Sequence, residues 1–194
     1  MVSITPFTIA VFSLLGIAQA ACYSGESSDL LCYNIPQNSS AIYARDMANA
    51  AWYLRGYGAE VPGGRLFTMP AENIPECAEW TLYEVGSALV LAKHINSTLN
   101  SSVLYSDIAF TIDGGFNNSA TDPNDEPPFT ENVQCLMDCP VDYGINTIGP
   151  GGSFGVRVNG SDPAYNASTY PVGYTPDGIL IKIVWSGQDS VPGL

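Results

Sequence analysis

The stretch AIYARDMANAAWYLR, residues 41–55, decides the fold class, because its apolar residues follow the spacing of a helix. The residues that share one helical face are Tyr43, Met47, Ala50, Ala51 and Leu54. Ser39 or Ser40 is the expected N-cap, and Gly56 or Gly58 the expected end. The sequence therefore predicts an amphipathic helix over residues 41–55.

Outside this helix, several stretches show the alternation or the compact apolar runs of β-strands. The expected strands are 64–69, 78–85, 88–95, 153–158 and 179–185. In the last of these, the side chains expected on the core face are Ile179, Ile181, Ile183 and Trp185. A second helix is expected after Ser101 or Ser102 as N-cap. Its apolar stripe is Leu104, Ile108 and Ile112, and Gly114 lies just past its end.

The order of these elements is helix, two or three strands, helix, and then further strands. This order predicts an α+β two-layer sandwich, in which one antiparallel sheet is covered on one face by two helices. A split β-α-β topology is the specific form that we expect. The length of the chain suits a single domain, which we place at residues 21–194.

Residues 1–20 have the features of a secretory signal peptide. The apolar run FTIAVFSLLGIAQA, residues 7–20, is too short to cross a bilayer and ends in the small-x-small pattern of a cleavage site. We expect cleavage after Ala20 or Ala21 and a secreted, extracellular protein. No later stretch is apolar enough to form a transmembrane segment.

Six Asn-x-Ser/Thr triplets agree with export as a eukaryotic glycoprotein, although a polar loop composition also produces such triplets. Their asparagines are Asn38, Asn96, Asn100, Asn117, Asn159 and Asn166. The five cysteines are Cys22, Cys32, Cys77, Cys135 and Cys139. In an oxidising compartment an odd count implies two disulfides and one remaining thiol, whose arrangement the sequence leaves open. The pairing we favour joins Cys22 to Cys32, and Cys77 to either Cys135 or Cys139.

The strong negative charge narrows the set of partners. Nineteen Asp and Glu residues against six Lys and Arg residues give a net charge of −13, which repels nucleic acid and anionic membranes. Most carboxylates then lack a cationic partner, a feature that suits an acidic extracellular fluid. His94 is the only histidine, and no second cluster of ligands accompanies the two cysteines at 135 and 139. We therefore expect no zinc site and no cofactor.

Several segments together resemble small secreted ascomycete proteins of uncharacterised function and, more distantly, the fungal necrosis-inducing effector family, whose fold is related to killer toxins. The residues that carry the resemblance are Arg45-Asp46-Met47, Tyr53-Leu54-Arg55, Cys77-Ala78-Glu79-Trp80, Ala92-Lys93-His94-Ile95, Ser106-Asp107-Ile108-Ala109 and Asp113-Gly114-Gly115. The resemblance covers residues 41–115, with a weaker part at 149–158. Met47 stands where the effector pattern has a cysteine. The resemblance implies secretion and an α+β sandwich, and it supplies no catalytic residues.

Two carboxylate pairs are candidates for acid chemistry. Glu79 and Glu84 differ by five strand positions, so they are expected on opposite faces, Glu84 with Trp80 and Leu82, and Glu79 with Thr81 and Tyr83. This predicts an ordinary strand that is held by a disulfide through Cys77 and has one solvent-exposed face. Asp107 and Asp113 flank the second helix and could each join a carboxylate elsewhere, but Asp113-Gly114-Gly115 is more simply a helix end.

The remaining candidates also have simpler structural explanations. His94 could be a general base, but no nucleophile elbow accompanies it, which favours a histidine near the surface at a strand end. The run of Asp122, Asn124, Asp125 and Glu126 lacks the spacing and the glycine of a calcium loop. Residues 149–155, GPGGSFG, form a turn that enters a strand. Tyr165, Tyr170 and Tyr174 could stack on sugars, or cover an edge of the sandwich.

The sequence thus favours a secreted, disulfide-stabilised, non-enzymatic interaction protein, effector-like or toxin-like. Its target would be an extracellular component of a host, a competitor or a cell wall. The alternative is a secreted acidic glycan-binding module or an acid hydrolase. An enzyme requires a pocket in which acidic side chains converge. An interaction protein requires only a contiguous exposed aromatic or apolar surface.

Overall fold

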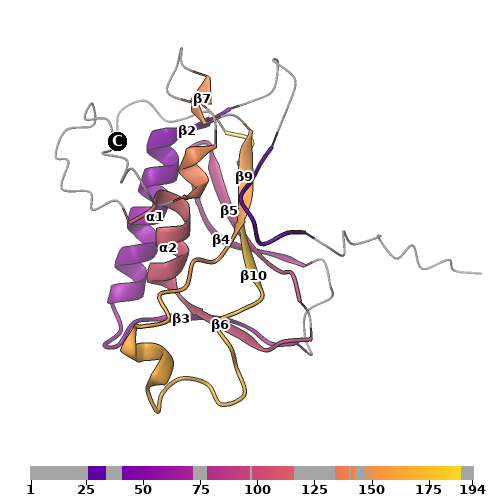
Figure 1. Cartoon of the computed structure of the whole chain (residues 1–194). Coiled ribbons are helices and arrows are strands. Elements are labelled where there is room, and N and C mark those ends of the chain that lie inside the picture. Colours follow the sequence, from indigo (N-terminus) through magenta and orange to yellow (C-terminus); the bar gives the residue numbers. More distant parts are fainter. Residues whose placement is uncertain are drawn as a thin grey trace, which may run out of the picture.

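The computed structural model describes residues 26–33, 41–71, 78–96, 98–115, 134–139, 141–142, 147–148 and 150–188. These residues form an antiparallel sheet of five strands that packs against two helices, so the expected α+β class is confirmed (Figure 1). The strands of this sheet are β1 (Leu31–Cys32), β4 (Glu79–Val85), β5 (Ala88–His94), β9 (Gly151–Gly155) and β10 (Ile179–Trp185). The helices are α1 (Ala44–Ala59) and α2 (Tyr105–Asp113).

Shorter elements surround this sandwich. Three short strands form a second sheet: β2 (Ile42–Tyr43), β8 (Thr147–Ile148) and β7 (Val141–Asp142). Strands β3 (Leu66–Met69) and β6 (Ser101–Leu104) pair with each other. Two short 3-10 helices are η2 (Leu136–Asp138) and η3 (Pro163–Asn166).

The order of strands in the main sheet is β1-β9-β10-β5-β4, and every neighbouring pair is antiparallel. Strand β10 pairs with β5 on one side and with β9 on the other, so that Ile181 lies opposite both Ala92 and Phe154. Strands β5 and β9 are therefore parallel to each other, and α2 lies between them in the chain.

The core lies between the sheet and the helices. Ile179, Ile181 and Ile183 of β10 are buried there, which confirms the expected core face for the three isoleucines. Burying one such side chain stabilises a fold by about 1.5–3 kcal/mol. Trp185, at the end of the same strand, is 38% exposed. The opposite face of β10 is also covered, since Leu180 and Lys182 are buried.

Helix α1 begins three residues later than predicted. Residues 42 and 43 form β2, which leads directly into the helix, and Tyr43 takes the N-cap position without a side-chain capping bond. The expected caps, Ser39 and Ser40, lie outside the described residues. The helix also continues through Gly56 and Gly58 to Ala59, because Gly58 faces α2 rather than a turn. A Cβ at Gly58 would lie 3.0 Å from the Cβ of Tyr105.

Helix α2 is shorter than predicted at its start. Residues 101–104 are buried on both faces and pair with β3, so Ser101 and Ser102 are strand residues and not caps. The end is as predicted. Gly114 adopts φ 70°, and its N–H donates to the carbonyl of Phe110, which is a helix end that glycine favours.

The disulfide within the described residues joins Cys32 of β1 to Cys139, just after η2. Strand β1 pairs with β9, which places Cys32 opposite Gly152, and a Cβ at Gly152 would lie 2.9 Å from the Cys139 sulfur. The favoured pairing of Cys22 with Cys32, and of Cys77 with Cys139, is therefore wrong. Cys135 is a buried free thiol, so its pairing with Cys77 is also wrong. Cys22 and Cys77 lie outside the described residues.

Candidate functional site

Six aromatic side chains from α1, α2 and strands β3 and β4 form a continuous strip. We call this group the aromatic strip: Tyr53, Tyr57, Phe67, Trp80, Tyr83 and Tyr105. Tyr53 stacks on Tyr83 with a centroid distance of 3.9 Å and continues along the helix to Tyr57 at 6.2 Å. Three edge-to-face contacts continue the strip. They join Tyr57 to Tyr105 at 5.0 Å, Tyr105 to Phe67 at 6.0 Å, and Phe67 to Trp80 at 6.1 Å. Such distances are those of favourable ring pairs.

A β-bulge in β4 brings two members of the strip to the same face. The pairing with β5 passes from Thr81 opposite Leu91 to Tyr83 opposite Val90, so Leu82 is the extra residue. Trp80 lies opposite Ala92, and side chains of opposed residues share a face. Trp80 and Tyr83 therefore lie on one face, and the predicted alternation through β4 is wrong beyond Thr81.

The strip contains both buried and exposed rings. Phe67 is only 7% exposed, whereas Tyr53 and Trp80 are 40% and 37% exposed. Trp52, the residue before Tyr53 in α1, is 59% exposed. Isolated exposed apolar residues are common, but rings in mutual contact form a surface, and Tyr and Trp are enriched in protein interfaces.

Arg65 supplies the positive charge of the strip. Its guanidinium lies 3.9 Å from the centroid of the Tyr57 ring and is held there by the Tyr57 carbonyl and the Glu60 carboxylate. This is a cation–π contact. Burial raises the pKa of Tyr83 and of Tyr105, so both phenols stay neutral across the physiological range. The strip can thus bind by ring stacking and by hydrogen bonds from neutral hydroxyls.

The same bulge corrects the prediction for Glu79 and Glu84. Glu79 lies opposite Lys93 and Glu84 opposite Leu89, so both carboxylates are on the same face of the sheet. They are separated by four residues of β5, which corresponds to about 13 Å. A glycosidase pair lies roughly 5–9.5 Å apart. The two glutamates therefore do not form such a pair, because of the distance between them and not because of their faces.

Glu79 instead belongs to a cluster of charges on the face of the sheet that points away from the helices. Lys182 of β10 donates to both Glu79 and Glu26 at 2.6 Å, and Lys93 of β5 lies 2.8 Å from Glu26. Both lysine side chains are nearly buried. Burial alone would raise the pKa of Glu26, but the bonds from Lys182 and Lys93 outweigh it and lower that pKa. The cluster fastens residue 26 to the sheet.

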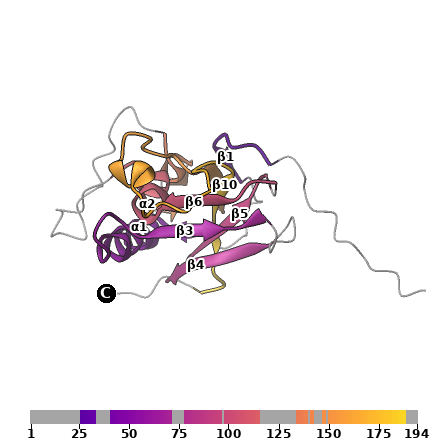
Figure 2. The ribbon, with the colours of Figure 1, turned by 90° about the horizontal axis from the view of Figure 1, so that it is seen from below.

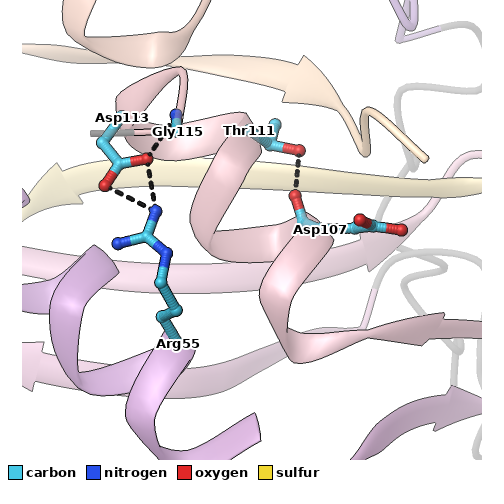
Figure 3. A network of polar contacts seen from close by, with 5 residues as sticks. All are labelled: Arg55, Asp107, Thr111, Asp113 and Gly115. Atoms are coloured by element: carbon cyan, nitrogen blue, oxygen red, sulfur yellow. Dashed lines mark hydrogen bonds and ion pairs between the residues drawn. The ribbon is translucent and has the colours of Figure 1, made fainter. Parts of the chain in front are cut away.

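Asp107 and Asp113 both lie on α2 and both have structural partners (Figure 3). Both carboxylate oxygens of Asp113 accept from the Nη2 atom of Arg55 in α1 at 2.8 Å, and one also accepts from the N–H of Gly115. The Thr111 hydroxyl donates to the carbonyl of Asp107. The Asp107 carboxylate accepts from the Tyr165 hydroxyl at 2.6 Å and from the N–H of Asn159 at 3.2 Å. Burial raises the pKa of Asp107, and these two bonds oppose the rise.

Both helices start in the same way. At α2, the N–H of Leu104 donates to the Tyr165 hydroxyl, which donates to Asp107, the third helical residue. At α1, the N–H of Tyr43 donates to the Ser87 hydroxyl, which donates to Asp46, again the third helical residue. A hydroxyl from a distant segment thus links the N–H of the N-cap residue to the carboxylate at the third helical position. A carboxylate in the first turn also interacts favourably with the helix dipole.

His94 is buried, with 4% exposure, so the predicted position near the surface is wrong. Its place at the end of β5 is as predicted, but it faces the core, and neither ring nitrogen has a hydrogen-bond partner among the described residues. Burial lowers its pKa. Within the same described residues, no group of His, Cys, Asp and Glu side chains could hold a metal ion.

Tyr165 and Tyr170 use their hydroxyls inside the molecule. Tyr165 binds Asp107, and Tyr170 donates to the Ser102 carbonyl at 2.8 Å. Both rings are half-buried and contact each other edge to face, which suits the covering of the sandwich better than a sugar platform. Residues 151–155 of the glycine-rich segment form β9, so the strand begins two residues earlier than predicted and ends three residues earlier, and the predicted turn is wrong for these residues.

Other predicted features are only partly described. The acidic run at Asp122, Asn124, Asp125 and Glu126, the asparagines Asn38 and Asn117, and the leader at 1–20 lie outside the described residues. Asn96, Asn100, Asn159 and Asn166 lie within them. The aromatic strip was not found by sequence reasoning. Its only local signal is the Trp-Tyr pair at residues 52 and 53 on the polar side of a helix.

No helix among the described residues is long and apolar enough to cross a membrane. Comparison with protein-family models, with curated proteins and with solved structures gives no match.

Proposed function

We propose that this chain is a secreted, disulfide-stabilised, non-enzymatic interaction protein, effector-like or toxin-like, which binds an extracellular target through the aromatic strip. The target would belong to a host, a competitor or a cell wall. The observation that carries the proposal is the continuous contact of six rings, two of which, Tyr53 and Trp80, are exposed. Tyr, Trp and Arg dominate binding energy in interfaces, and Arg65 lies on the strip.

The arrangement of carboxylates supports a role in structure rather than in catalysis. Among the described residues, the buried Asp46, Asp107 and Asp113 each accept hydrogen bonds from a group that holds two segments together. Glu79 is paired with a lysine and lies far along the strand from Glu84. A hydrolytic site needs acidic groups that converge on a substrate.

The topology supports the killer-toxin-like form of the sandwich. The unit β5-α2-β9 has two parallel strands joined through a helix, with β10 between them. This is the arrangement expected for a split β-α-β fold. Together with the resemblance carried by residues 41–115, it favours the effector-like proposal over an unrelated binding module.

The runner-up function is a glycan-binding module that uses the same surface. Its support is the exposure of Trp52, Tyr53 and Trp80, since sugars stack on exposed rings. The two proposals differ in the occupant of the strip, a protein surface or a polysaccharide.

The experiment compares two tryptophans of equal exposure. Trp80 and Trp185 are 37% and 38% exposed, but only Trp80 belongs to the strip. Purified secreted protein is incubated at acidic pH with chitin, β-glucan, mannan and cellulose and, separately, with surface proteins extracted from plant and fungal cells. Bound protein and released oligosaccharide are both measured.

We expect retention on surface proteins that W80A and Y53A each weaken at least about tenfold, a loss of about 1.4 kcal/mol. W185A should bind like the wild type. Retention on a polysaccharide with the same dependence on Trp80 would establish the glycan-binding alternative. Release of oligosaccharide, or equal loss in W80A and W185A, would overturn the proposal.

A further inference from the structure

The Asn-x-Ser/Thr triplets at Asn96, Asn100, Asn159 and Asn166 differ in whether their third residue is exposed or buried. Glycosylation of such a triplet requires the Ser or Thr two positions after the asparagine. Thr98, Ser161 and Ser168 are exposed, and so are the asparagines of their triplets, Asn96, Asn159 and Asn166. In the triplet of Asn100, the third residue is Ser102, which is fully buried.

The three exposed triplets lie in turns at the surface. The Asn96 side-chain carbonyl accepts from the N–H and the hydroxyl of Thr98, at 3.1 and 2.6 Å, so asparagine and hydroxyl already face each other. The Asn159 carbonyl oxygen accepts in the same way from the N–H of Ser161. Asn166 is the last residue of η3. Each side-chain nitrogen can carry a bulky group without disturbing a strand.

The triplet of Asn100 is part of the folded sheet. The Ser102 hydroxyl lies 3.0 Å from the Thr68 hydroxyl in the β3–β6 pair, and the N–H of Ser102 donates to the carbonyl of Thr175. The half-buried Asn100 side chain accepts from the N–H of Ala71 at 2.9 Å. A glycan at this asparagine would have to fit between these segments.

We propose that the exported protein carries N-linked glycans at Asn96, Asn159 and Asn166, and none at Asn100. In each transfer the side-chain nitrogen bonds to the anomeric carbon of a lipid-linked oligosaccharyl diphosphate. The bond from that carbon to the diphosphate oxygen breaks, the lipid diphosphate leaves with the electron pair, and the amide loses one proton to a base. A glycan on Asn100 would oppose the contact of its side chain with Ala71 beside the β3–β6 pair, so chains modified there are expected to be depleted from the folded product.

The modified asparagines lie in two separate parts of the fold. Residues 95–100 are joined to the segment 174–178 by backbone hydrogen bonds between Ile95 and Gly178 and between Thr175 and Asn100. Helix η3, which ends in Asn166, lies on the opposite side of the β3–β6 pair from β4 (Figure 2). Asn96 follows β5 by two residues, and Ala92 of β5 lies opposite Trp80, whereas Asn159 and Tyr165 are both bonded to Asp107 of α2.

The inference rests on the export part of the proposed function, and the experiment separates the two. The full chain is secreted from yeast, once with its own leader and once with residues 1–20 replaced by a yeast secretion leader. Folded protein from the medium is deglycosylated by peptide N-glycosidase in heavy-oxygen water, which converts each occupied asparagine to a labelled aspartate. Peptide mass spectrometry then reports the occupancy of each site.

We expect label at Asn96, Asn159 and Asn166 and unmodified Asn100. On gels, N96Q, N159Q and N166Q should each remove one glycan, and N100Q none. Substantial label at Asn100 in folded protein, or an unlabelled site among the other three, would overturn the inference. Failure of export with the native leader alone would contradict secretion and leave the site assignment intact.

Discussion

The hydroxyl of Tyr165 connects three segments of the fold, η3, β6 and α2. It accepts from the N–H of Leu104 at 2.9 Å and donates to Asp107 at 2.6 Å. It thereby fastens η3 to the junction between β6 and α2. Burial, followed by the bond to Asp107, raises the pKa of this phenol, so it remains protonated across the physiological range.

Removing this hydroxyl should destabilise the fold. In Y165F, the N–H of Leu104 and one bond of Asp107 lose their partner, and an unsatisfied buried polar group costs about 1–3 kcal/mol. We expect the free energy of unfolding, measured by urea denaturation, to fall by that amount. Y174F is the matched control, because the Tyr174 hydroxyl makes no hydrogen bond to any described residue. Its effect should stay within about 0.5 kcal/mol. Equal effects of both variants would contradict the role of Tyr165.

At the scale of elements, the contact between the two helices depends on Gly58. A Cβ at this position would lie 3.0 Å from the Tyr105 Cβ and 3.4 Å from the Ser106 nitrogen. Gly56, two residues earlier in the same helix, has open space around its Cα. Substitution of Gly56 thus tests helix propensity alone, whereas substitution of Gly58 also tests the packing between the helices.

The pair predicts opposite results for the same substitution. Alanine favours a helix over glycine by about 1 kcal/mol, so G56A should raise the free energy of unfolding by up to that amount. In G58A the added methyl pushes against α2, and we expect no gain or a net loss. Thermal and urea denaturation of both variants measure the difference. A G58A variant as stable as G56A would show that the helices do not need glycine at this contact.

The strand and helix periods of the sequence predicted most elements but missed both helix starts. Alternation and apolar runs located β3, β4, β5, β9 and β10, and Gly114 marked the end of α2. A serine before an apolar helical stripe is a usual sign of a helix start, so the sequence predicts both starts at serines. In the structure neither N-cap residue makes a side-chain capping bond; its N–H donates instead to Ser87 or Tyr165, which are distant in sequence, so no local signal could show the start.

The aromatic strip could not be predicted for a similar reason. Strict alternation placed Trp80 and Tyr83 on opposite faces, and a single extra residue, Leu82, reverses this. A bulge depends on pairing with β5 and leaves no clear mark in β4 itself. The contacts of Tyr57 with Tyr105, and of Tyr105 with Phe67, join residues that only the tertiary fold brings together.

At the scale of the whole molecule, most of the few Lys and Arg side chains form ion pairs with particular carboxylates. Of the six Lys and Arg residues, all of which are described, Arg45, Arg55, Arg65, Lys93 and Lys182 lie within 4 Å of an acidic group. The predicted tolerance of acid therefore has an exception at Glu26. Because its folded pKa is lowered, its contribution to stability is complete above its ordinary value of 4.5 and is lost as the pH falls through the folded pKa.

The lowered pKa of Glu26 predicts how the effect of an E26Q substitution on stability depends on pH. At pH 7 the variant should be less stable than the wild type by about 1–2 kcal/mol, after allowance for partial solvent screening of the ion pairs. Below the folded pKa of Glu26 the difference should disappear, because the wild type has then lost the same charge. The free energy of unfolding of both proteins is measured by urea denaturation at each pH. The contributions of Asp107 and His94 are common to both proteins and cancel in the difference. A difference that is independent of pH would contradict the ion-pair assignment.

The disulfide between Cys32 and Cys139 spans 107 positions of the chain. Loss of a disulfide from a small domain costs about 2–5 kcal/mol, largely through the greater freedom of the unfolded chain. We expect C139S to lower the free energy of unfolding by this amount. C135S is the control, because its thiol is free and buried, with a pKa raised to about 12 by burial and by the nearby Asp138. A loss in C135S as large as in C139S would contradict this pairing.

The same bond determines what a single cut in the chain can do. Any one peptide bond broken between Cys32 and Cys139 leaves two pieces that remain covalently joined, and both helices lie within that interval. A protease that finds a site there produces a nicked molecule of unchanged mass apart from one added water. The pieces separate only after reduction and denaturation. A cut in this interval therefore leaves the molecule covalently intact although its backbone is broken, a property that would suit the proposed export.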